Sequence, residues 1–182
     1  MRIYLGSGPN IKDGFINCDA RPFPGVDHVF YVGRDPFPFK DNSVDMILAE
    51  SFCEHLGWSD TEDYFMNMMD ECFRVLKPMG FLDISVPHFP SPSSIMHPEH
   101  RRFFITETFS FFHVPADGID PHGYLKGFWH VCVDEHLTNK DMIHVRLWPN
   151  KPGGKYDYKE IRLRNEITEK GEYEKQSTGR IG

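Results

Sequence analysis

The chain lacks several features that would place it in a common class of protein. Its four cysteines lie far apart without a Cys-x-x-Cys pair, which argues against a zinc ribbon or a small disulfide-bonded scaffold. Because 20 Lys and Arg residues stand against 27 Asp and Glu residues, for a net charge of -7, a nucleic-acid-binding surface is not expected. No apolar run is long enough for a signal peptide or a membrane span. We therefore expect a cytoplasmic protein with reduced thiols, no membrane anchor and no nucleic-acid partner.

What the chain does contain suits one compact fold. With 182 residues, of which 40% are hydrophobic and 14% aromatic, it can bury a core without disulfide bonds. The composition changes at "KPGG", which starts at residue 151 and is typical of a hinge. We expect a single domain over residues 1–150, followed over residues 151–182 by one exposed strand ("YDYKEIRLR") and a charged tail.

The apolar pattern predicts strands that alternate with helical segments. Strands are expected at residues 2–5, 15–18, 26–32, 44–49, 81–86, 130–133 and 142–148. Residues 59–77 predict an amphipathic helix with Ser59 and Glu62 spaced as a capping box; its apolar stripe contains Phe65, Met68, Met69, Cys72 and Leu76. A short helix is expected at residues 106–112, capped by Thr106. The alternation predicts an α/β fold with a mainly parallel sheet, centred on the apolar residues 44–49.

The first predicted strand runs into "GSGPN", at residues 6–10. Residues without a Cβ let backbone amides come close to a ligand, and Asp19, at the end of the next strand, could accept hydrogen bonds from a ribose. A dinucleotide site would need GxGxxG and an acid about twenty residues further on. Here Ile11 takes the place of the third glycine, and Asp19 follows Gly6 by thirteen residues. The pattern favours a mononucleoside cofactor, with a purely structural turn as the alternative.

Four successive motifs resemble those of class I S-adenosylmethionine-dependent methyltransferases, especially the small type-11-like group. They are "YLGSGPN", "INCDARP", "PFPFKDNSVDMILAESFCEHL" and "ECFRVLKPMGFLDISVP", and "HPEHRRFFITETF" adds a further likeness. The resemblance implies a Rossmann-like, mainly parallel sheet with a late antiparallel strand. It also implies S-adenosylmethionine as cofactor, bound across the carboxyl ends of the first strands.

The resemblance further implies roles for individual residues. The cofactor-binding residues would be Leu5, Gly6, Ser7 and Gly8 around the methionine moiety, Asp19 on the ribose, Asp35 near the adenine, and Glu50 at the end of the central strand. A different register of the same motif gives the adenine contact to Tyr31. Phe37 and Phe39 either pack against the purine or belong to the core.

The chain departs from the family where the first strands are joined. The segments between the first four strands are too short for full crossover helices, which normally need a dozen or more residues. We therefore expect shortened crossovers and one thinly covered sheet face. Late segments of the chain or a second copy in a homodimer would cover that face, and homodimerisation is our hypothesis.

Methyl transfer from an activated sulfonium mainly requires alignment and exclusion of water, and a general base helps where the acceptor is a hydroxyl or a protonated amine. His55 and Glu54, after the central strand, are the candidate catalytic residues. Residues 87–104 form a candidate substrate loop. Its candidate binding residues are His88, His97, His100 and Arg101. For each single histidine, a structural role is the alternative.

The same loop allows other interpretations. The residues in it that could bind zinc or iron are His88, His97, Glu99 and His100. Because they are irregularly spaced among prolines, a substrate loop is favoured and no metal is expected. Arg101 and Arg102 would bind an anionic substrate, or one of them pairs with Glu99 or Glu107 and is structural.

The sequence thus predicts an enzyme that transfers a methyl group from S-adenosylmethionine to a small-molecule, glycan or nucleotide-sugar-like acceptor. An alternative of another class is a cofactor-binding module that has lost catalysis and serves as an interaction subunit. A nicotinamide-dependent oxidoreductase is a third hypothesis, which the missing GxGxxG and the early acid disfavour.

Overall fold

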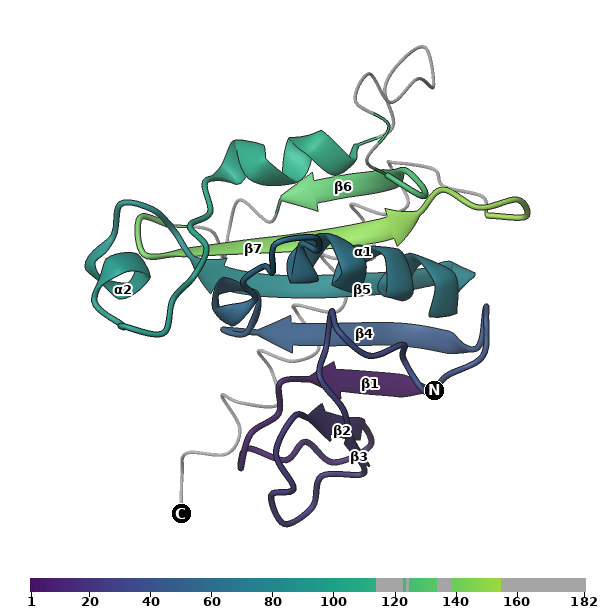
Figure 1. Ribbon diagram of the computed structural model, residues 1–182. Coiled ribbons are helices and arrows are strands. Elements are labelled where there is room, and N and C mark those ends of the chain that lie inside the picture. The colour runs from purple at the N-terminus through teal and green to yellow at the C-terminus, as the bar shows by residue number, and fades with distance from the viewer. Residues whose placement is uncertain (114–122, 124, 134–138, 155–182) are drawn as a thin grey trace, which may run out of the picture. The chain divides into compact units, whose positions relative to one another are not determined.

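The computed structural model describes residues 1–113, 123, 125–133 and 139–154 (Figure 1). Residues Met1–Pro152 form one compact unit, and Gly153–Gly182 form a second, of which only residues 153 and 154 are described. The strand predicted in "YDYKEIRLR" and the charged tail lie outside the described residues. The predicted domain boundary after residue 150 stays a prediction.

The described residues form a seven-stranded sheet with the strand order β3-β2-β1-β4-β5-β7-β6. Its strands are β1 (Arg2–Leu5), β2 (Ile16–Asp19), β3 (His28–Val29), β4 (Val44–Glu50), β5 (Leu76–Pro87), β6 (Trp129–Val133) and β7 (Met142–Pro149). The pairs from β3 through β5 are parallel, whereas β7 runs antiparallel to both of its neighbours. The prediction of a Rossmann-like, mainly parallel sheet with a late antiparallel strand is confirmed.

Strand β4 occupies the middle of the sheet, as its apolar sequence predicts. β1 pairs on one side of the strand and β5 on the other, and the side chains of Val44, Ile47 and Ala49 are fully buried. Strand β3 is shorter than expected, with two residues instead of seven. After it the chain closes a turn, in which the amides of Arg34 and Asp35 donate to the Tyr31 carbonyl and cannot pair with β2.

Helix α1 (Tyr64–Val75) lies in front of β5 in Figure 1, and four residues of its predicted apolar stripe, Phe65, Met68, Met69 and Cys72, are buried. It begins later than predicted, because Asp63, not Ser59, caps it by accepting hydrogen bonds from the amides of Phe65 and Met66. Ser59 instead closes a separate turn by accepting from the Glu62 amide. The helix ends at Val75 because Leu76 already pairs with Val44 and starts β5.

The other helical segments are short. They are the 3-10 helix η1 (Cys53–His55), α2 (Pro92–Ile95) and the 3-10 helix η2 (Thr106–Phe112), the last preceded by Ile105 as its cap instead of Thr106. Residues 6–43 contain no helix, so the shortened first crossovers are confirmed. Within the described residues, no helix is long and apolar enough to span a membrane.

The topology sets the position of the candidate site. Parallel strands β1, β2, β4 and β5 end at one edge of the sheet, and η1 and the α2 segment lie at that edge (Figure 1). Residues that follow these four strands therefore come together, although they are far apart in the sequence.

Candidate active site

The glycine turn after β1 places two backbone positions in the left-handed region. Gly6 has φ +64° and Gly8 has φ +53°, values that residues with a Cβ rarely adopt. Leu5 and Ser7 are buried, and the Ser7 amide donates to the Cys18 carbonyl at 3.1 Å. The turn is therefore fixed against the end of β2, where the motif resemblance predicts it.

Asp19, the last residue of β2, lies beside this turn. Its Oδ2 accepts a hydrogen bond from the Gly8 amide at 2.8 Å, and its Oδ1 accepts one from the Arg21 amide at 2.9 Å. Each carboxylate oxygen has two lone-pair positions, so each can still accept one ribose hydroxyl. No atom lies within 4 Å of a Cβ built on Gly8, so there is space for a ligand on that side.

Phe52 covers the other glycine of the turn. A Cβ on Gly6 would lie 2.1 Å from an atom of the Phe52 ring, so only glycine fits beneath this side chain. Phe52 directly precedes η1, and the contact joins the end of β1 to the segment after β4. Sequence reasoning missed Phe52, because nothing in the motif indicates which side chain lies on the glycine.

Glu50, at the end of β4, forms an ion pair with Lys12 of the β1–β2 connection at 3.0 Å. It also hydrogen bonds to Tyr4; burial and, next, the charge of Glu50 raise the pKa of this phenol to about 12. Tyr4 and Lys12 are thus part of the candidate cofactor edge, although the sequence did not single them out. The adjacency of β1 and β4 is the feature that reveals them.

The residues considered for the adenine contact share one turn. Asp35 is exposed, and its Oδ2 accepts a hydrogen bond from the Tyr31 amide at 2.8 Å. Both registers of the motif therefore place the adenine contact in the same short segment. Phe37 and Phe39 are buried members of the hydrophobic core, as the structural interpretation of these two residues predicts.

Glu54 is the buried acid of the site. Its side chain is 2% exposed, and its Oε2 is one of two buried side-chain atoms without a hydrogen-bond partner among the described residues, the other being Arg102 Nε. Burial raises the pKa of this carboxyl to about 7, against a smaller lowering effect of His100. The Glu54 carbonyl accepts hydrogen bonds from the Arg101 amide at 2.8 Å and the Arg102 amide at 3.1 Å. These two bonds join η1 to residues 87–104.

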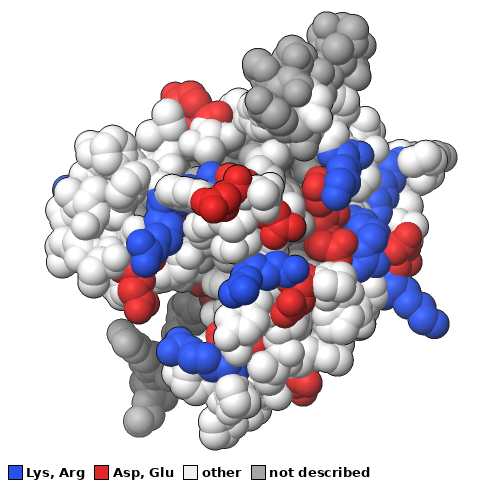
Figure 2. All heavy atoms as spheres, viewed as in Figure 1, with Lys and Arg blue, Asp and Glu red and all other residues white. Residues whose placement is uncertain are grey.

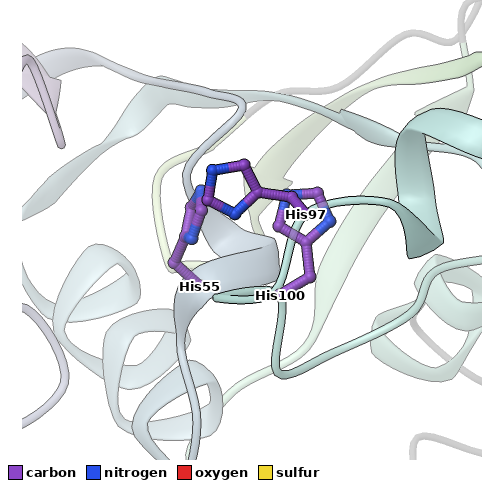
Figure 3. A group of neighbouring side chains, drawn as sticks. All are labelled: His55, His97 and His100. Atoms are coloured by element: carbon purple, nitrogen blue, oxygen red, sulfur yellow. The ribbon is translucent and has the colours of Figure 1, made fainter.

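Three histidines from the two joined segments converge, as Figure 3 shows: His55, His97 and His100, which we call the histidine cluster. The ring centroid of His55 lies 5.3 Å from that of His97 and 4.9 Å from that of His100. The His97 and His100 rings stack 5.0 Å apart. Sequence reasoning named all three residues but assigned His55 to catalysis and the other two to substrate binding, without placing them together.

Two members of the cluster are oriented by backbone carbonyls. His100 Nδ1 lies 2.9 Å from the Ser94 carbonyl, which can only accept, so this nitrogen carries the proton. His55 likewise donates to the Glu99 carbonyl. Burial, followed by the neighbouring His100, lowers the pKa of His55 below its ordinary value. In the neutral ring of each of these histidines, the lone pair is therefore on the second nitrogen.

The remaining loop residues take other positions. His88 donates from Nδ1 to the Asn139 carbonyl at 2.9 Å and is not part of the histidine cluster. Arg102 donates to both carboxylate oxygens of Asp63 at 2.7 Å, so the structural interpretation of this arginine holds, but its partner is not Glu99 or Glu107. Sequence reasoning missed this partner, because it assigned Asp63 only to the helix. Arg101 is exposed.

The surface at this edge is partly apolar. Exposed large side chains of the 87–104 segment are Phe89, Ile95, Met96 and Phe103. Over the face that carries α1, by contrast, acidic and basic side chains are interspersed (Figure 2). The segment around the histidine cluster thus combines apolar contact surface with few charges.

Comparisons with known proteins show what the chain is similar to. Residues 15–84 match the family model described as a methyltransferase domain. No curated protein sequence matches the chain at comparable significance.

Solved structures share the fold at low sequence identity. An S-adenosylmethionine-dependent methyltransferase from Archaeoglobus fulgidus is 13% identical with a TM-score of 0.57, and the match covers 81% of this chain and 85% of that one. The methyltransferase (CMeT) domain of the citrinin polyketide synthase is 14% identical with a TM-score of 0.56, over 83% of this chain but only 46% of that one.

A third structure carries ligands. It is phosphoethanolamine N-methyltransferase 1 from Haemonchus contortus, in complex with phosphoethanolamine and S-adenosylhomocysteine. It is 11% identical with a TM-score of 0.53, over 86% of this chain and 40% of that one. The family-model match over residues 15–84 and the shared sheet agree with the resemblance inferred from the motifs: the chain has the class I methyltransferase fold and is similar to S-adenosylmethionine-dependent methyltransferases.

Proposed function

We propose that this chain transfers the methyl group of S-adenosylmethionine to a hydroxyl or amine of a small-molecule or glycan acceptor. The proposal is carried by one observation: at the edge where the strands end, Glu54 is buried and one of its carboxyl oxygens has no hydrogen-bond partner among the described residues. An acid in this position is suited to take a proton from an acceptor.

The glycine turn and Asp19 fit the cofactor. The open space beside Gly8 admits a ligand next to the backbone, and both Asp19 oxygens have lone pairs left for the ribose hydroxyls. Asp35 or Tyr31 would contact the adenine, and Glu50 with Lys12 would border the methionine moiety. These assignments extend the motif resemblance to the folded chain.

Glu54 and the loop would act on the acceptor. S-adenosylmethionine supplies an activated methyl group: the bond to the acceptor atom forms as the carbon–sulfur bond breaks, and the electron pair of that bond goes to sulfur. Glu54 takes the proton that the acceptor loses. The exposed Arg101 and the apolar side chains Phe89, Met96 and Phe103 would hold the acceptor in line and keep water out.

Two measurements on the full chain test this function. Calorimetric titration should detect binding of S-adenosylmethionine and S-adenosylhomocysteine but not of NAD. In a methyl-transfer assay over a panel of hydroxyl and amine acceptors, Glu54→Gln should lower kcat by roughly 10²-fold or more, the range of general-base contributions, with cofactor affinity unchanged. The exposed Glu62→Gln is the matched control. Absence of cofactor binding would refute the proposal.

A second candidate function is a cofactor-binding module without catalysis. The absence of helices between β1 and β4 favours it, because this leaves the cofactor edge with less surrounding structure than a full set of crossover helices would give. Cofactor binding without a methylated product over the whole panel would support this candidate. The homodimer stays a prediction, and a monomer mass in light scattering at micromolar concentration would contradict it. The cytoplasmic location also stays a prediction.

A further inference from the structure

The histidine cluster has the composition of a transition-metal site. One ring nitrogen from each of His55, His97 and His100 lies within 4.8 Å of the others. Three imidazoles suit zinc and neighbouring divalent metals, and three protein ligands with one open position are typical of catalytic zinc sites. The cluster also joins two segments more than forty residues apart in the sequence, so it is not a by-product of local spacing.

The hydrogen bonds around the cluster have the pattern found behind metal ligands. In such sites a ligating histidine donates its other ring N–H to a carbonyl or carboxylate, which fixes the tautomer and the ring orientation. His100 donates to the Ser94 carbonyl and His55 to the Glu99 carbonyl, so in the neutral ring of each the lone pair lies on the other nitrogen.

His97 is the adjustable member. Tetrahedral zinc with bonds of about 2.0–2.1 Å requires ligand nitrogens about 3.3–3.4 Å apart, closer than the widest separation in the cluster. The His97 side chain is exposed, and its Nδ1 accepts only a long hydrogen bond of 3.3 Å from the Glu99 amide. Its rotation can therefore close the site without disturbing the core.

We propose that His55, His97 and His100 bind one divalent transition-metal ion, with zinc as the best match, and leave one coordination position for the oxygen of the acceptor. The second part of this proposal rests on the proposed methyl transfer. It narrows the acceptor to a hydroxyl compound, because bound metal lowers the pKa of a coordinated hydroxyl and favours its ionised, nucleophilic form. The proton that this hydroxyl loses goes to Glu54, the buried acid next to His55 in η1.

Metal content tests the site without any enzymatic assay. The full chain is stripped with a chelator, incubated with Zn²⁺ or Co²⁺, dialysed, and its metal content measured by mass spectrometry. We expect about one equivalent for the wild type, and His97→Ala should weaken binding at least 100-fold, since even the loss of outer hydrogen-bond partners costs 10- to 100-fold. His97→Ala should fold normally, because the side chain is exposed. His55→Ala and His100→Ala should show the same loss.

His88→Ala is the matched control, because it removes a histidine of the same loop that lies outside the cluster. It should keep the full metal content. A wild type that binds no metal, a His97→Ala variant that binds as tightly as the wild type, or equal loss in His88→Ala would overturn the proposal.

The open position has its own test. Azide added to the Co²⁺-loaded chain should shift the visible absorption bands if a coordination position is exchangeable, and unchanged bands would overturn that part. Calorimetry with S-adenosylmethionine on the same stripped protein separates the two proposals. Cofactor binding without metal binding would leave the methyl-transfer proposal standing and remove this one. Metal binding without cofactor binding would remove the methyl-transfer proposal, together with the acceptor role that rests on it, and leave the metal site standing.

Discussion

The glycine turn and the histidine cluster lie at the same edge of the sheet but are built in opposite ways. Residues 5–19 bring the turn and Asp19 together through one strand pair, β1 with β2, so a short stretch of sequence contains both. The histidine cluster instead combines η1 with residues 87–104, which α1 and β5 separate along the chain and which come together only in the folded sheet. The first region is therefore visible as a motif, and the second is not.

The difference extends to what holds each region in place. Backbone geometry fixes the glycine turn, through two positive φ angles and the hydrogen bonds of Asp19. Contacts between distant segments fix the histidine cluster: the Glu54 carbonyl with the Arg101 and Arg102 amides, and Arg102 with Asp63 of the α1 cap. Substitutions in the first region should act locally, and those in the second should act through these connections.

The largest effect on stability is expected at Gly6. Gly6→Ala places a Cβ 2.1 Å from the Phe52 ring at a φ of +64°, whereas Gly8→Ala meets no atom within 4 Å at a φ of +53°. Backbone strain and overpacking should together cost Gly6→Ala about 3 kcal/mol of unfolding free energy, against about 1–2 kcal/mol for Gly8→Ala. Urea denaturation measures both. Equal losses would mean that the Phe52 contact is not rigid.

Asp19→Ala should have the largest effect on the cofactor. It removes the acceptor of the ribose hydrogen bonds, so affinity for S-adenosylmethionine should fall by about 2 kcal/mol or more, roughly 30-fold. Titration calorimetry gives the value, and Asp13→Ala, an exposed acid in the same connection, should bind as the wild type does. An unchanged affinity in Asp19→Ala would place the ribose elsewhere.

Glu54→Gln tests the buried acid of the second region by its pH dependence. In the folded, metal-free chain the carboxyl stays protonated up to about pH 7, while in the unfolded chain it ionises above its ordinary value of 4.5. Its contribution to stability is therefore fully present below pH 4.5 and falls as the pH rises to 7. Glutamine does not ionise, so the variant should gain about 3 kcal/mol over the wild type at pH 8 relative to pH 4.5.

Denaturant melts of chelator-treated protein at the two pH values measure this gain. A constant difference between Glu54→Gln and the wild type would show that burial does not raise the pKa of the carboxyl. Glu62→Gln, at an exposed position, should show no such gain.

Asp63→Ala should have the smallest effect. It removes the cap of α1 and the partner of Arg102, and the loss of a helix cap costs about 1 kcal/mol of unfolding free energy. Ser59→Ala, at the position that sequence spacing favoured as the cap, should cost less, because Ser59 lies outside the helix. A larger loss in Ser59→Ala, measured by thermal unfolding, would return the cap to the predicted position.

Much of the fold was predictable, because its signals are local. The strand at residues 2–5 has the predicted limits, and the apolar residues 44–49 form the central strand, as such a run predicts. The predicted start of α1 was wrong by five residues. Two helix caps compete here, Ser59 paired with Glu62 and Asp63 by itself, and sequence spacing does not show which one begins the helix. Strand β3 is short because the chain turns at Tyr31, and the apolar pattern of the sequence does not indicate this turn.

The candidate site was predictable in its residue types more than in its arrangement. His55, His97 and His100 were each selected by their position after a strand, yet the metal interpretation was tested on His88, His97, Glu99 and His100, all from one loop. Spacing within a loop carries no information about a ligand from another segment. Phe52 and Lys12 were missed for the same reason, because their contacts, on Gly6 and with Glu50, join separate strand ends.

The sequence by itself determined the glycine turn, the acid after the second strand and the alternation of strands and helix, because hydrophobic period, missing Cβ atoms and short spacing act between neighbours along the chain. Only the tertiary structure decided that the Phe52 ring packs on Gly6, that Arg102 pairs with Asp63, and that three histidines meet at the edge where the parallel strands end. Those contacts depend on which strand ends lie side by side, and strand order is a property of the whole sheet.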